Sequence, residues 1–216
     1  MLGCWEANRG QKFSIYFHAA IISLLRPLVF QQHHETTLGL SSADERPAEA
    51  VSSASVSQLK RLMVLYQSRS SAEMATVHWH TACLYVANAV IRRAGEANSR
   101  RSYLYRCLEG YKTLYPRYAV SVPIFKGLLS MAVSNGLMTS QEAYEYLSQL
   151  LAKKEHPSPV AGPTESCFMV DLDLALTDQV AAHIDSLAQR FDDMVMFDNF
   201  THGRADEDGG VSVALP

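Results

Sequence analysis

Hydrophobic residues recur at helical spacing over most of the chain. Between residues 57 and 152 the apolar positions fall three and four apart, which places them on one face of successive helices. This pattern predicts helices at 57–69, 73–93, 100–115, 121–134 and 139–152, without a convincing alternating strand pattern among them. A further helix is predicted at 11–27. We therefore expect an all-α fold, an irregular array of about six helices.

Local signals predict where several of these helices begin and end. Pro27 and Pro116 should end the helices before them, because proline lacks the N–H that continues the backbone ladder. Asn135-Gly136 is typical of a helix C-terminus. Thr139-Ser140-Gln141-Glu142 matches a capping box, in which a hydroxyl and a carboxylate each bind an unpaired backbone N–H.

Two polar stretches divide the chain. Residues 31–56 are rich in Ser, Ala and Glu and offer little for a core, so they are predicted to be a flexible linker. Residues 153–166 contain three prolines and predict a second linker. The expected organisation is an amino-terminal helix in 1–30, the linker in 31–56, a helical domain in 57–154, and a Pro-rich linker with an acidic, aromatic and partly disordered tail in 155–216.

The most apolar stretch of the chain covers residues 15–25. A membrane-spanning helix needs about 20 apolar residues, and Arg26-Pro27 is expected to close this stretch too early. It is therefore predicted to be a buried helix, with no membrane partner.

Composition and charge exclude several classes of protein. The chain has 19 basic and 22 acidic residues and a formal charge of -3, so it lacks the basic balance typical of a nucleic-acid-binding domain. Its four cysteines lie far apart and form no C-x-x-C pair, which argues against a zinc ribbon or a disulfide framework. Scattered cysteines of this kind usually behave as small buried hydrophobes.

Candidate catalytic and metal-binding residues are few. The chain has neither a phosphate-binding glycine loop nor a G-x-S-x-G motif. His78 and His80 lie two residues apart on a helix, so their rings should point in different directions and cannot share an ion. Asp171, Asp173 and Asp178 suggest calcium only weakly, because the glycine and glutamate of an EF-hand loop are missing. We expect no catalytic residue, no metal site and no cofactor.

A local basic cluster is better explained as a solvated or partner-binding helix face than as a phosphate contact. It comprises Arg92, Arg93, Arg100, Arg101, Arg106 and Lys112.

Several segments resemble one family of regulators. Residues 59–69, Leu-Lys-Arg-Leu-Met-Val-Leu-Tyr-Gln-Ser-Arg, are similar to the L-x-x-L-x-x-L-Y-x-S-R helix of fungal zinc-binuclear-cluster transcription factors, specifically the group that includes the nitrate-assimilation activator. The likeness continues, in the order of the family, through residues 16–27, 78–85, 168–178 and 187–193. The resemblance is therefore distributed, in separate segments, over most of residues 13–200.

The resemblance implies a transcription regulator in the nucleus, in a metabolic or secondary-metabolite pathway. It implies helix-packing motifs and transfers no catalytic or ligand residue. Full members of the family begin with six closely spaced cysteines that hold two zinc ions, followed by a basic linker and a coiled coil. None of these is present, so we expect no direct DNA binding by this chain, and partners in the transcription machinery, coactivators or full-length relatives.

Acidic and aromatic residues interleave after residue 166, as in activation segments that contact a coactivator groove. The candidate contact residues are Leu187, Phe191, Met194, Phe197 and Phe200. The same pattern fits residues 183–200 as an amphipathic helix packed on the core, and the sequence does not separate the two. Alternative functions are a helical interaction module that inhibits full-length relatives, or a product without function.

Overall fold

Helices make up nearly all of the chain that the structure describes. The computed structural model describes residues 2–37, 47–67, 76–92, 96–152 and 168–202; side chains are described for 10–32 of the first segment and up to 197 of the last. These residues form eight α-helices, one short 3-10 helix and no regular strand, which confirms the all-α prediction. The elements are α1 (Leu2–Thr37), α2 (Pro47–Gln67), α4 (Val77–Arg92), α5 (Ala97–Leu114), α6 (Ser121–Ser134), α7 (Ser140–Ala152), η1 (Leu174–Leu176), α8 (Gln179–Ala182) and α9 (Ile184–His202).

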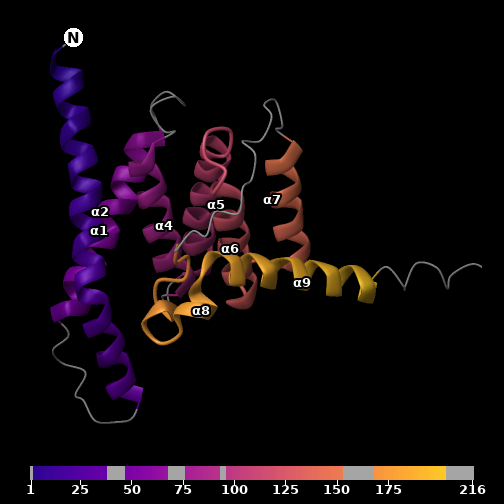
Figure 1. The fold of residues 1–216 in the computed structure, drawn as a ribbon. Helices are drawn as coiled ribbons and strands as arrows, with labels where there is room; N and C mark the ends of the chain where they lie inside the picture. The colour runs from indigo at the N-terminus through magenta and orange to yellow at the C-terminus, as the bar shows by residue number, and fades with distance from the viewer. Residues whose placement is uncertain (1, 38–46, 68–75, 93–95, 153–167, 203–216) are drawn as a thin grey trace, which may run out of the picture.

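The helices stand side by side, with the last one lying across them. Figure 1 shows α1 at one edge of the array and α7 at the other, with α9 running across the ends of α6 and α7. The closest packing occurs between α1 and α2, between α4 and α5, and between α6 and α9. The single isolated β-bridge of the described residues joins Met169 to His183 and closes the loop that carries η1 and α8.

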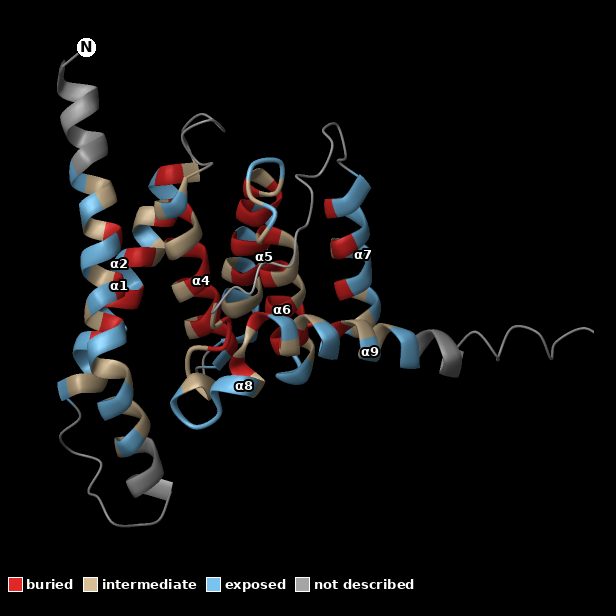
Figure 2. Cartoon of the chain, viewed as in Figure 1, coloured by how far each residue is buried: buried red, intermediate tan, exposed pale blue. Residues whose placement is uncertain are grey.

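One hydrophobic core connects the first helix to the last. Its buried side chains run from Ile15 on α1, through Trp79 on α4 and Leu128 on α6, to Phe191 on α9. Figure 2 shows the most deeply buried residues on α4, α5 and α6, at the centre of the array. At this centre Gly110 of α5 lets Trp79 approach, because a Cβ there would lie 2.7 Å from the indole nitrogen.

The predicted helix ends around α6 and α7 are confirmed. Asn135 ends α6, and Gly136 follows with a φ of +66°, a conformation that favours glycine. The capping box has both of its hydrogen bonds: the Thr139 N–H donates to Glu142 Oε2 at 2.8 Å, and the Glu142 N–H donates to Thr139 Oγ1 at 3.2 Å. The bond from the Thr139 amide is the main cause that lowers the pKa of Glu142.

The prediction that Pro27 ends the first helix is wrong. The helix α1 continues through Pro27 to Thr37. An interior proline costs about 3 kcal/mol or more, and tertiary packing offsets this cost: α1 rests on α2 and α4, and Arg26 forms an ion pair with Asp173. The length argument against a membrane span fails with it, since Gly10–Gln32 is long and apolar enough to cross a bilayer by length and composition alone.

The predicted linker at 31–56 is also wrong for the residues that the structure describes there. Residues 31–37 continue α1, and α2 begins at Pro47, a proline position that suits a first helical turn. Ser52 and Ser55 are buried, because their small side chains let α2 approach its neighbours closely. Residues 38–46 of the predicted linker lie outside the described residues.

The other helix boundaries agree with prediction to within a few residues, except that α1 begins nine residues and α2 ten residues earlier than expected. Two apolar residues at helix ends are half exposed: Val77 at the start of α4 and Leu151 at the end of α7. Beyond residue 167 the tail contains η1, α8 and α9. The predicted linker at 153–166 and the disorder predicted near the carboxyl terminus lie outside the described residues.

Candidate functional site

The segment of residues 168–176 is tied to α4 by a buried asparagine. Asn88, which is 1% exposed, donates its side-chain N–H to the Val170 carbonyl at 2.9 Å. Its side-chain oxygen accepts the Leu172 N–H at 2.9 Å. The Asn88 side chain thus pairs with the Val170 carbonyl and the Leu172 N–H as a neighbouring strand would.

Two arginines hold the next residues of this segment. Arg92 of α4 forms an ion pair with Asp171, and Arg26 of α1 forms one with Asp173. Asp171 is 2% exposed and also accepts the Leu174 N–H at 3.0 Å. Asp178 accepts the Ala181 N–H at 2.9 Å and so caps α8. The carboxylates that weakly suggested calcium are therefore bound to arginines and backbone amides.

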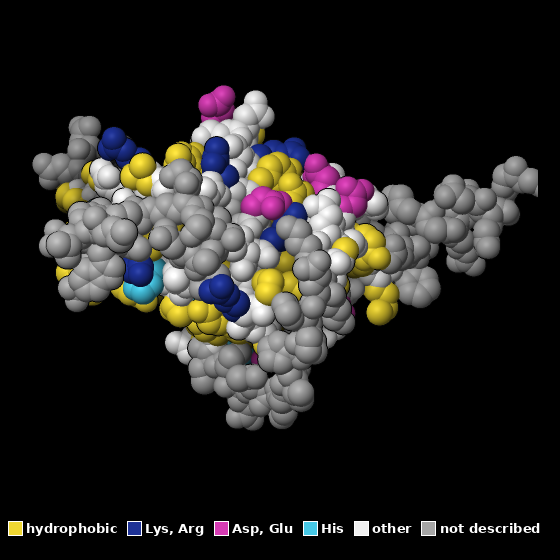
Figure 3. Space-filling view, turned by 90° about the horizontal axis from the view of Figure 1, so that it is seen from above, with side chains coloured by type: hydrophobic (Ala, Val, Ile, Leu, Met, Phe, Trp, Pro, Cys, Tyr) yellow, Lys and Arg dark blue, Asp and Glu magenta, His cyan; other side chains and the backbone are white. Residues whose placement is uncertain are grey.

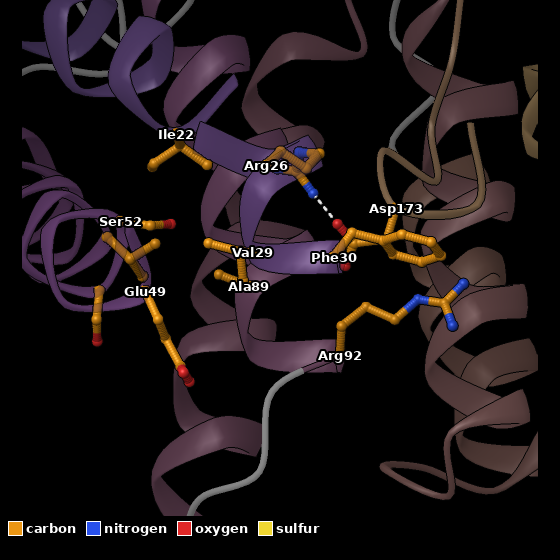
Figure 4. Close-up of a pocket in the computed structure, with 11 residues that line it drawn as sticks. Ile22, Arg26, Val29, Phe30, Glu49, Ser52, Ala89, Arg92 and Asp173 are labelled. Carbon is orange, nitrogen blue, oxygen red and sulfur yellow. Dashed lines mark hydrogen bonds and ion pairs between the residues drawn. The ribbon is translucent and has the colours of Figure 1, made fainter. Parts of the chain in front are cut away.

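A cavity of about 540 Å³ lies between α1, α2 and α4, beside these ion pairs. Figure 4 shows Arg26 directed toward Asp173, with Ile22, Val29 and Ala89 on the apolar walls. Its charged lining residues are Arg26, Arg92, Glu49 and Asp173. Opposite charges on the walls partly neutralise one another, and the rest of the lining is apolar or serine.

The predicted activation-segment residues lie on α9 but in different environments. Leu187 and Phe191 are each 1% exposed and belong to the core, and Met194 is half-buried against it. Phe197 is 68% exposed, as is its neighbour Met196 at 59%. The side chain of Phe200 lies outside the described residues. The interpretation as a packed amphipathic helix therefore describes the first half of α9, and coactivator contact remains a prediction.

An ion pair and a glycine position α9 on α6. Lys126 of α6 donates to both carboxylate oxygens of Asp192, at 2.7 and 2.8 Å. Gly127 allows the close approach, because a Cβ there would lie 3.1 Å from Val170 Cγ1 and 3.4 Å from Leu187 Cβ. Asp192, one of the acidic residues that suggested an activation segment, thus helps to hold α9 on α6. The sequence pattern alone did not reveal this contact.

The two histidines of α4 face different neighbours, as their spacing predicted. The His78 ring lies 4.8 Å from the ring of Tyr16 on α1. His80 Nδ1 lies 3.0 Å from the Tyr111 hydroxyl on α5, and its ring packs against Phe168. Within the residues that the structure describes, no group of three or more His, Cys, Asp or Glu could hold a metal ion.

Burial of His80 predicts acid sensitivity. Loss of hydration lowers the pKa of His80 to about 4, from an ordinary 6.5. The unfolded chain therefore binds a proton over this range that the folded chain does not, so stability falls as the pH falls from 6.5 toward 4. In urea denaturation we expect the free energy of unfolding to fall by roughly 2 kcal/mol between pH 7 and about pH 4.5. The variant His80→Gln should lack this fall, and the control His78→Gln should largely retain it. An unchanged acid loss in His80→Gln would assign it to other groups.

The described residues of the basic cluster bind other groups of the same chain. Arg100 donates to the carbonyls of Val90 and Ile91 at 2.8 Å, which caps α4. Arg101 pairs with Glu142, and Lys112, only 7% exposed, pairs with Glu109. Figure 3 shows Lys and Arg side chains scattered among apolar and acidic ones on the face in view. The described members of the cluster favour a structural role over phosphate contact.

Two of the four cysteines, Cys83 and Cys107, are buried and unpaired by disulfides, as predicted for small core residues. Burial raises the pKa of the Cys83 thiol, so it is not a reactive thiolate. The side chains of Cys4 and Cys167 lie outside the described residues.

No family model, no curated protein and no solved structure matches this chain. The resemblance to the fungal zinc-binuclear-cluster regulators therefore rests on the sequence motifs alone.

Proposed function

We propose that this chain is a non-catalytic transcription regulator of the fungal zinc-binuclear-cluster kind, acting in the nucleus without direct DNA contacts. The quoted helix motifs support the family. Its partners would be coactivators or other parts of the transcription machinery.

The observation that carries this proposal is the division of α9 into two parts. Leu187 and Phe191 anchor its first half in the core, while Met196 and Phe197 lie on its exposed second half. Carboxylates accompany these exposed apolar side chains, and Asp193 is exposed beside them. An amphipathic helix that presents apolar side chains to a groove is a common mode of partner recognition. We propose Met196 as a further contact, alongside Met194, Phe197 and Phe200.

A reporter experiment tests this proposal. The full chain is fused to a heterologous DNA-binding domain, and transcription is compared with that of the variant Met196→Ala/Phe197→Ala. We expect the fusion to activate, and the variant to lose most of the signal, because truncation of apolar anchors is what costs binding energy. The control is Val180→Ala, which truncates another exposed apolar residue, 78% exposed, on α8. A silent wild-type fusion would contradict the proposal.

The alternative of an interaction module that inhibits full-length relatives is favoured by a different feature, the exposed apolar residues of α1. Phe13 and Leu24 are 74% and 76% exposed, and exposed apolar patches mark interaction surfaces. Under this alternative, co-expression with a full-length relative should lower that relative's reporter activity even when Met196 and Phe197 are both replaced by alanine.

A further inference from the structure

The helix α1 has two opposite apolar faces, and only one of them is covered. Ile15, Ala19 and Ile22 are buried against the rest of the fold. On the opposite side lie Phe13, Phe17, Leu24 and Leu28, which are 74%, 53%, 76% and 49% exposed. These four residues are spaced by four, seven and four positions and therefore share one face of the helix. We call them, with Ala20, the outer stripe.

The outer stripe is free of charge along its whole length. Between Gly10 and Gln32 the charged residues are Lys12 and Arg26. Arg26 is directed inward to Asp173. Lys12 is half-buried near His78 of α4, whose pKa is lowered first by burial and then by the charge of Lys12. An uncharged apolar face of this length is typical of an interaction surface, so we expect a partner to cover the outer stripe.

A lipid bilayer is a poor match for this helix in its folded position. The segment Gly10–Gln32 has the length and composition of a span, but a span would separate α1 from α2 and α4. It would also carry Arg26 and its partner Asp173 into hydrocarbon or break their ion pair, and either outcome is costly. A protein surface can cover the outer stripe and leave the inner face as it is.

We propose that the outer stripe pairs with the outer stripe of a second copy of this chain. Positions 13, 17, 20 and 24 follow the alternating spacing of four and three that lets two helices interlock along a seam. The four exposed apolar residues offer roughly 500 Å² per copy, so a pair would bury up to about 1,000 Å², the lower limit for a specific interface. Uncharged faces also meet without like-charge repulsion, and a two-fold pair needs only one self-complementary patch.

Sedimentation equilibrium of the full chain tests the pairing. We expect a dimer at micromolar concentration, and at least a 100-fold weaker association for Phe17→Glu/Leu24→Glu, because each copy would bury two carboxylates against those of its partner. The control Val180→Glu places a charge at an exposed apolar residue of α8 and should leave the dimer unchanged. Circular dichroism should show the same helix content in all three proteins. A wild-type chain that remains monomeric at about 100 µM overturns the proposal.

Cross-linking supplies a test that does not depend on a disruptive variant. Ala20 is exposed and lies at the middle of the outer stripe, so two copies should bring residue 20 together in either orientation. In a Cys4→Ser/Cys167→Ser background, Ala20→Cys should form a disulfide-linked dimer on air oxidation, whereas Val180→Cys should not. Equal cross-linking of the two variants overturns the pairing. A second result would also overturn the pairing: a monomeric chain that floats with phosphatidylcholine–phosphatidylglycerol vesicles, when Phe17→Glu/Leu24→Glu does not. That result would assign the outer stripe to lipid.

Discussion

Replacement of Phe191 by alanine is expected to lower the free energy of unfolding by about 3 to 5 kcal/mol, the usual cost of truncating a buried phenylalanine. Phe191 is 1% exposed and lies where α9 crosses α6. The variant should leave a cavity between these helices, because Gly127 and the Lys126–Asp192 ion pair hold the backbones in place. Urea denaturation followed by circular dichroism measures the loss.

The matched control is Phe197→Ala, the same substitution six residues later on α9. Phe197 is 68% exposed, so its truncation should change stability by no more than about 0.5 kcal/mol. It should instead lower reporter activity in the fusion experiment. If both variants lost the same stability, α9 would pack along its whole length, and the proposed partner surface on its second half would be wrong.

Replacement of Asn88 by alanine is expected to cost about 3 kcal/mol. The substitution leaves the Val170 carbonyl and the Leu172 N–H without their side-chain partner in a buried position, and each unsatisfied group costs about 1 to 3 kcal/mol. The substitution should also loosen residues 168–176 locally, in addition to lowering the free energy of unfolding of the whole chain. The Leu172 amide should exchange its hydrogen faster than the amides of α6.

Asn135→Ala serves as the control for Asn88→Ala because the same atoms are removed. Asn135 donates to the Met131 carbonyl at the end of α6 and is exposed, so its truncation should cost about 1 kcal/mol or less. If Asn88→Ala were no more destabilising than Asn135→Ala, the anchoring of residues 168–176 to α4 would depend on the arginine–aspartate pairs instead.

The two arginine–aspartate pairs also bear on how the chain could respond to partners. Arg26 and Arg92 come from α1 and α4, and both bind the short segment that leads into α9. The covered side of α1 and the attachment of α9 are therefore connected through Asp171 and Asp173. The outer stripe lies on the face of α1 opposite to Arg26, so the two proposed partners, a second copy and a coactivator, would bind to separate surfaces.

Local sequence determined much of this fold. The apolar stripes of α4, α5 and α6 predicted these helices to within a few residues, and the cap at Thr139–Glu142 and the glycine after α6 were read directly from residue types. These signals succeed because each depends on interactions within one turn of a helix or on one repeated apolar face. The spacing of His78 and His80 likewise sufficed to direct their rings to different neighbours.

Tertiary structure decided the features that depend on distant residues. Pro27 is a break by local rules, yet α1 continues because its inner face packs on α2 and α4 and Arg26 meets Asp173, 147 positions away. The serines of α2 look like linker residues until α1 lies against them, and polarity alone does not show that small side chains can be buried. The candidates on α9 divided into core and surface for the same reason: periodicity shows that a helix has an apolar face, but only its position on α6 determines how much of that face is covered.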